Sequence, residues 1–121
     1  MPRTSLTVQE PTRFTQLTNP TQNAPDVANG NRFVNDGKIM LYVVNGSGGN
    51  ITVTVDIAVL YDTDIAITDR SYTLATGTRT CLGPFPTSYN QTLDSVANSI
   101  GLNISSASSV TVELIRITAA N

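Results

Sequence analysis

The sequence contains no histidine, and its single cysteine is Cys81. Without an imidazole, Ser-His and Cys-His nucleophiles, histidine-containing zinc sites and imidazole acid–base catalysis are excluded. A solitary cysteine can form neither an internal disulfide nor a cysteine-based zinc site. Because Cys81 falls within a predicted strand, we expect a buried, unreactive thiol. The sequence therefore predicts no catalytic residues, no enzymatic activity and no cofactor.

Charged residues are also scarce, at 13% of the chain, compared with about 25% in an average protein. The seven Arg and Lys residues form no basic run, and the formal net charge is −2. We expect no nucleic-acid binding, because neutralising a phosphate backbone needs clustered cations. No apolar run approaches the roughly 18 residues of a membrane span, so no membrane partner is expected. A surface rich in Thr, Ser and Asn instead favours contact with a large partner, because few charges must be desolvated.

The strongest positive signal is an alternation of apolar and polar residues between Asn35 and Leu60. Residues 38–45 and 51–57 are rich in Val, Ile, Tyr and Thr, which favour strands. Apolar residues recur at every second position of 51–57, so one face of that strand is predicted to be buried. The glycine-rich stretch 46–50 separates the two strands, and we interpret the whole as a hairpin.

Further predicted strands follow at near-regular spacing, at residues 71–75, 79–82, 102–104 and 110–117. Residues 91–100 have helical spacing of apolar positions, so a short helix or an irregular segment is predicted there. A chain of 121 residues suits one domain. The fold class predicted is all-β, an antiparallel, jelly-roll-like β-sandwich of about seven or eight strands.

Residues 1–30 read differently, because four prolines recur there among Thr, Gln and Asn. We predict an extended N-terminal arm over 1–30 and a β-sandwich domain over 31–121. Ordering some twenty-five residues costs about 25–50 kcal/mol of backbone entropy, whereas burying five apolar side chains returns at most about 10–15 kcal/mol. The arm is therefore expected to become ordered on a partner; a flexible tail without a role is the alternative. The predicted partner contacts are Arg3, Leu6, Val8, Arg13, Phe14 and Leu17.

Two further groups of side chains could bind a ligand. Asp62, Asp64 and Asp69 are candidates for a cation site or a catalytic carboxylate pair. The ligand pattern of a calcium loop does not continue past Asp64, which favours solvated acids, one of them paired with Arg70. Among the aromatic residues, Tyr89 lies beside two prolines and is the candidate for an exposed sugar-stacking ring; core packing is the alternative for the tyrosines and phenylalanines as a group.

Several short motifs together resemble a known family. They are Asn35-Asp36-Gly37, the strands Leu41–Asn45 and Thr52–Val55, Asp69-Arg70, Gly83-Pro84-Phe85-Pro86 with Tyr89-Asn90, and the valine-rich last strand. Over about residues 33–117 the chain resembles the head decoration, or cement, proteins of tailed bacteriophages. The segment 91–99 is longer than in that pattern, and the arm is not part of it.

The resemblance implies a virion protein on the outer face of the capsid. Such a protein would bind the major capsid protein and copies of itself, as dimers or trimers, and would reinforce the shell by bridging neighbouring subunits. Two other interpretations stay open: another virion β-domain, from a tail, neck or fibre, and a carbohydrate-binding adhesion module. An enzyme or an unrelated soluble domain is the remaining alternative.

Overall fold

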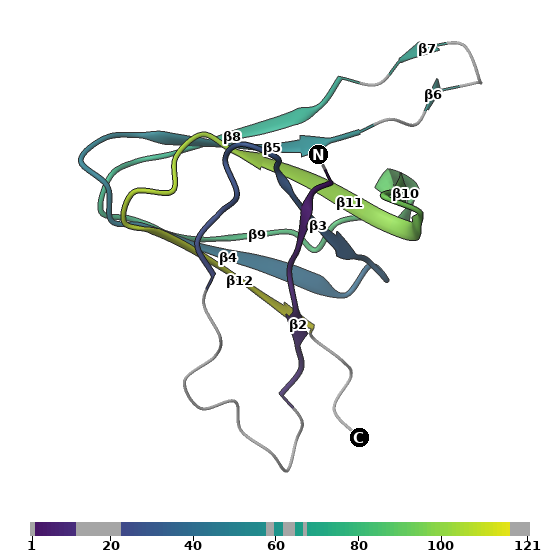
Figure 1. The fold of residues 1–121 in the computed structure, drawn as a ribbon, viewed down its shortest axis with the longest axis horizontal. Coiled ribbons are helices and arrows are strands. Elements are labelled where there is room, and N and C mark those ends of the chain that lie inside the picture. The colour runs from purple at the N-terminus through teal and green to yellow at the C-terminus, as the bar shows by residue number, and fades with distance from the viewer. Residues whose placement is uncertain (1, 12–22, 58–59, 62–64, 67, 117–121) are drawn as a thin grey trace.

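The protein folds into two facing β-sheets (Figure 1). A computed structural model describes residues 2–11, 23–57, 60–61, 65–66 and 68–116. Its strands are β1 (Thr4–Ser5), β2 (Val8–Gln9), β3 (Asn31–Val34), β4 (Ile39–Asn45), β5 (Ile51–Asp56), β6 (Leu60–Tyr61), β7 (Ile65–Ala66), β8 (Arg70–Leu74), β9 (Arg79–Leu82), β10 (Gln91–Leu93), β11 (Val96–Ile104) and β12 (Val110–Arg116), with a 3-10 turn, η1, at Thr87–Tyr89. The prediction of an all-β sandwich is confirmed.

The six-stranded sheet has the order β1-β3-β11-β5-β8, with β10 paired to β11, and the four-stranded sheet has the order β2-β12-β4-β9. The longer strands pair antiparallel, as predicted, whereas the short N-terminal strands β1 and β2 run parallel to β3 and β12. Strands β6 and β7 pair with each other and project beyond the ends of β5 and β8 (Figure 1). This two-stranded ribbon extends the hairpin that β5 and β8 form.

The core lies between the two sheets and is built by alternation along the strands. In β4, residues Ile39, Leu41 and Val43 are fully buried, and β5 buries every second residue in the same way. Phe33 on β3 and Phe85 pack with ring centroids 6.1 Å apart at a tilted angle. Strands with this period of two bury one face and leave the other to solvent or a partner.

The predicted hairpin over residues 38–57 is wrong in its pairing. Strands β4 and β5 form as predicted, but β4 pairs with β12 and β9, and β5 pairs with β11 and β8. The glycine-rich segment 46–50 therefore crosses from one sheet to the other. Both strands have apolar residues at alternate positions. When the strands lie in opposite sheets, these residues face each other across the core and are buried as fully as they would be in a hairpin.

The helix considered for residues 91–100 is also wrong, because β10 and the first part of β11 form a tight hairpin there. Asp94 and Ser95, at its tip, have φ angles of 51° and 67°. Short polar residues tolerate this left-handed conformation, which a two-residue hairpin turn needs. No helix within the described part of the chain is long and apolar enough to cross a membrane.

Candidate functional site

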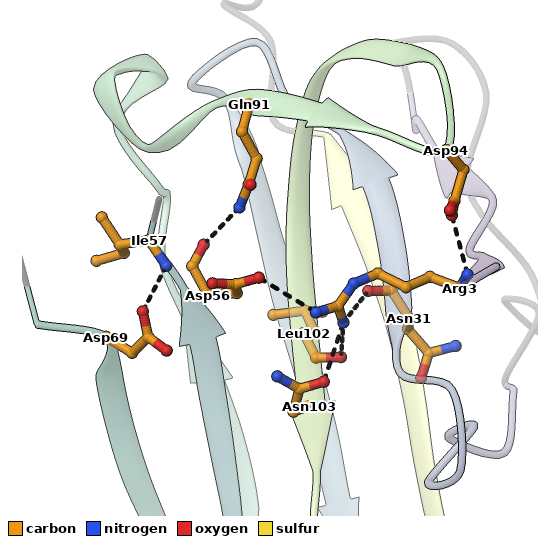
Figure 2. Close-up of polar contacts among 9 residues, drawn as sticks. All are labelled: Arg3, Asn31, Asp56, Ile57, Asp69, Gln91, Asp94, Leu102 and Asn103. Carbon is orange, nitrogen blue, oxygen red and sulfur yellow. Dashed lines mark hydrogen bonds and ion pairs between the residues drawn. The ribbon is translucent and has the colours of Figure 1, made fainter. Parts of the chain in front are cut away.

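Arg3 is the centre of a polar cluster on the outer face of the six-stranded sheet (Figure 2). Its Nη1 donates to the carbonyl oxygen of Leu102 at 3.1 Å and to Oδ1 of Asn103 at 3.0 Å. Its Nη2 forms an ion pair with Oδ2 of Asp56 at 3.2 Å, and its backbone N–H donates to Asp94 at 2.9 Å. The side chains of Arg3 and Asp56 are 17% and 30% exposed. The cluster therefore joins the N-terminal segment to β5, β11 and the β10–β11 turn.

Two glycines make room for the Arg3 side chain. A Cβ atom at Gly101 would lie 3.0 Å from Cζ of Arg3, and one at Gly30 would collide with Nη1. Gly30 also has a φ of +79°, which glycine adopts at little cost. The guanidinium can lie against the backbone at these positions because no side chain stands in its way.

The described part of the N-terminal segment lies on the protein's own sandwich. The backbone N–H of Thr4 donates to Gly30 and that of Leu6 donates to Arg32, at 3.0 and 2.9 Å. Between β1 and β2 the Leu6 side chain, 6% exposed, enters the core, and Val8 packs against it. The segment thus covers the β3 edge of one sheet and the β12 edge of the other.

For residues 2–11, the expectation that the arm needs a partner for order is wrong. These residues form hydrogen bonds with two edges of the chain's own sheets and bury Leu6. Those contacts offset the backbone entropy lost on ordering, so no second protein is needed to order residues 2–11. Leu6 is a core residue, and Arg3 is engaged by its own sandwich. The other predicted arm contacts, Arg13, Phe14 and Leu17, lie outside the described residues, as do Asp62 and Asp64.

Asp69 bonds to the backbone, and the described residues place no metal-ligand set around it. Its Oδ1 accepts a hydrogen bond from the backbone N–H of Ile57 at 2.8 Å, which links the two sides of the β5–β8 hairpin (Figure 2). No group of three or more Cys, Asp or Glu residues suited to a metal ion occurs among the described residues. Within that part of the chain, Asp69 is a structural residue.

Tyr89 and Cys81 differ in exposure from what the sequence predicted. Tyr89 is partly buried and packs against the core, so only part of its surface is open to a ligand. The Cys81 side chain is exposed rather than buried, because its position in β9 places it opposite Tyr42 on the outer face of the four-stranded sheet. Alternation alone could not decide which face of this short strand points inward.

Asn35 links the turn Asn35-Asp36-Gly37 to the segment that contains Phe85 and Asn90. Nδ2 of Asn35 donates to the carbonyl oxygen of Phe85 at 3.1 Å and to Oδ1 of Asn90 at 2.9 Å. Asn35 is buried, and sequence reasoning assigned it no role beyond a turn. The only available sequence signal is an amide at a turn between strands, which is also common on protein surfaces. These hydrogen bonds hold the two segments together.

The outer faces of the two sheets differ in chemistry. The outer face of the six-stranded sheet carries the hydroxyls of Thr52, Thr54, Ser71 and Thr73 beside the Arg3 cluster. The outer face of the four-stranded sheet carries the partly exposed apolar side chains of Met40, Tyr42, Val44 and Ile115. We call these the hydroxyl face and the apolar face. No family model matches the chain, and no curated protein or solved structure shows significant similarity to it.

Proposed function

We propose that this chain is a structural protein of a phage virion that binds the outer surface of the capsid and reinforces it by bridging neighbouring subunits. The observation that carries the proposal is the hydroxyl face, on which Thr52, Thr54, Ser71 and Thr73 present hydroxyls beside the Arg3 cluster. The β6–β7 ribbon projects from the β5–β8 hairpin of this face (Figure 1). Such a face contacts a large partner at low desolvation cost, because hydroxyls exchange hydrogen bonds with water for hydrogen bonds with protein. The motif resemblance to decoration proteins supports the same assignment.

The bridging contact would come from the sandwich rather than from residues 2–11. Strands β1 and β2 occupy two sheet edges of their own chain, so they are not available to add to a sheet of the capsid protein. The opposite edges of the two sheets are formed by β8 and β9. A capsid subunit would meet the hydroxyl face, and its neighbour would meet the projecting ribbon. Repetition over the shell would convert modest single contacts into tight attachment.

The stoichiometry of purified particles tests this function. In particles of the virus that encodes the chain, a stained gel should show it at a copy number comparable with that of the major capsid protein. A tail, neck or fibre protein would be present in about a dozen copies or fewer, since those parts occupy one vertex. An adhesion module would bind glycans on an array, and a decoration protein would not.

A variant of the hydroxyl face sharpens the test. Thr73 is exposed on β8, and Thr73→Glu places a charge in the proposed contact without disturbing the core. When the variant is added to shells that lack the protein, we expect the number of copies bound to be lower than for wild type by about tenfold or more, because the new charge must be desolvated on binding. Asn50→Asp, in the exposed loop between the sheets, is the matched control and should bind as wild type. Equal occupancy for both variants would exclude this face as the capsid contact.

A further inference from the structure

The apolar face carries three rows of side chains that run across the strands. One row is Arg79–Val44–Thr111, the next is Cys81–Tyr42–Glu113, and the third begins with Met40–Ile115. Strand β4 runs down the middle, with β9 on one side and β12 on the other. The outward residues Met40, Tyr42 and Val44 of β4 are all partly exposed, although Met and Val are residues that a protein normally buries.

Two charged residues flank this apolar centre, and neither forms an ion pair with a described residue. Glu113, on β12, is 6% exposed, and its Oε2 has no hydrogen-bond partner. Arg79, on β9, is exposed and forms no ion pair with any described residue. A buried carboxylate oxygen without a donor costs free energy, which an incoming donor would recover once the Glu113 side chain turns outward. The face therefore has an acceptor on one side of β4 and a donor on the other.

We infer that the apolar face binds the apolar face of a second copy of this chain, about a two-fold axis that runs parallel to β4. Rotation about such an axis places Tyr42 over Tyr42 and places each copy's β9 over its partner's β12. Cys81 then lies opposite Glu113 of the second copy, and the long Arg79 side chain lies one row away. Both can donate hydrogen bonds to the carboxylate, the guanidinium more strongly than the thiol.

The alternative two-fold axis in the plane of the interface runs across the strands. That axis would stack β12 on β12 and β9 on β9. If it passed through the Tyr42 row, Glu113 would face Glu113, and Arg79 of each copy would lie over the partner's β9, two strands away from the partner's Glu113. Like charges placed opposite each other destabilise such a contact. The strand order β12-β4-β9, with opposite charges on its outer strands, therefore favours the axis parallel to β4. Sheets stacked this way pack about 10 Å apart, at the small angle of aligned β-sandwiches.

This inference deepens the self-association included in the proposed function and rests on it, but it is tested in solution without a capsid. Sedimentation velocity of the full chain across the micromolar range should show a dimer. Tyr42→Asp should give a monomer, because two carboxylates would meet at the axis. Thr73→Glu, on the hydroxyl face, should remain a dimer. The proposed capsid contact and the proposed dimer contact are therefore tested by different variants, and either can be disproved without the other.

A double-mutant cycle tests the pairing of the two charges. Arg79→Met and Glu113→Gln should each weaken the dimer by about tenfold, and the double variant should be little weaker than either. Far-UV circular dichroism identifies any variant that fails to fold, and Arg79→Glu, on an exposed side chain, replaces Tyr42→Asp if that variant is unfolded.

Three outcomes would overturn the inference. They are a monomer throughout the concentration range, a dimer that neither Tyr42→Asp nor Arg79→Glu weakens, and fully additive losses for Arg79 and Glu113. A monomeric wild type whose Tyr42→Asp variant leaves the capsid would assign this face to the shell instead of to a second copy.

Discussion

Asn35 and Asn90, 55 residues apart, exchange two hydrogen bonds. Nδ2 of Asn35 donates to Oδ1 of Asn90 at 2.9 Å, and Nδ2 of Asn90 donates to the carbonyl oxygen of Asn35 at 3.0 Å. Asn35→Ala should lower the free energy of unfolding by about 2–3 kcal/mol, because buried partners lose their donor. Urea denaturation measures this, with Asn50→Ala, in an exposed loop, as the control. Equal stability of the two variants would contradict a structural role for this pair.

Arg3 should contribute to stability through its charged hydrogen bonds. Arg3→Ala removes donors to Leu102, Asn103 and Asp56 and should cost about 1.5–3 kcal/mol. Arg70→Ala removes an exposed arginine that forms no ion pair with a described residue, so it should change stability by less than about 0.5 kcal/mol. Denaturant unfolding of both variants checks the difference. If Arg3→Ala is as mild as Arg70→Ala, the cluster does not anchor the segment.

Gly30 should tolerate alanine less well than Gly77 does. Both have a positive φ, +79° and +77°, so both pay the cost of a side chain in the left-handed region. A Cβ at Gly30 also collides with Arg3, whereas nothing lies within 4 Å of one at Gly77. The thermal midpoint of Gly30→Ala should therefore fall further. The combination Gly30→Ala with Arg3→Ala should recover part of that loss, since the collision with Nη1 is removed while the contact with Oδ1 of Asn103, at 2.7 Å, remains.

Leu6 should behave as a core residue even though it lies in the proline-rich N-terminal segment. Leu6→Ala should destabilise the protein by about 2–4 kcal/mol, because it opens a cavity where β1 passes to β2. Val27→Ala is the matched control, since Val27 is 49% exposed in the same N-terminal region. Calorimetry compares the two variants. A wild-type midpoint for Leu6→Ala would return this residue to the role of a partner contact.

Asp26 should make the attachment of the N-terminal segment sensitive to acid. The Thr4 hydroxyl donates to its Oδ2 at 2.6 Å, and the backbone N–H of Asn29 donates to Oδ1; these bonds lower the pKa of Asp26 below its ordinary value of 3.8. Because the pKa is lower in the folded state, the stabilisation is complete above about pH 3.8 and is lost as the pH falls through the folded value.

Unfolding measured against pH checks this linkage. Wild type should lose stability below about pH 3.8 more steeply than Asp26→Asn, which cannot titrate there. Asp36→Asn serves as the control for removing a carboxylate. Asp36 pairs with Arg116 and forms no ion pair with the described residues of the N-terminal segment. Parallel pH curves for wild type and Asp26→Asn would show that the Thr4 contact does not hold the segment.

The positions and faces of most strands follow from the sequence alone. Alternation is a local property, so Ile51, Val53 and Val55 could be assigned to one buried face before any partner strand was known. The absence of histidine likewise excluded whole classes of chemistry without reference to the fold. Arg3 was predicted to contact a partner because of its place in the N-terminal segment. Its observed partners, Asp56 and Leu102, lie far along the chain, and no local sequence pattern marks them.

Only the tertiary structure decided which strands pair, which sheet edges the N-terminal segment covers and which side chains lie on each outer face. Alternation shows which face of a strand is buried but does not show which strand pairs with it, so β4 and β5 were compatible with a hairpin and with opposite sheets. The burial of Leu6 and the exposure of Cys81 depend on contacts between residues distant in sequence. The opposite placement of Glu113 and Arg79 around β4 has the same origin, since it exists only after β9 and β12 take their places beside that strand.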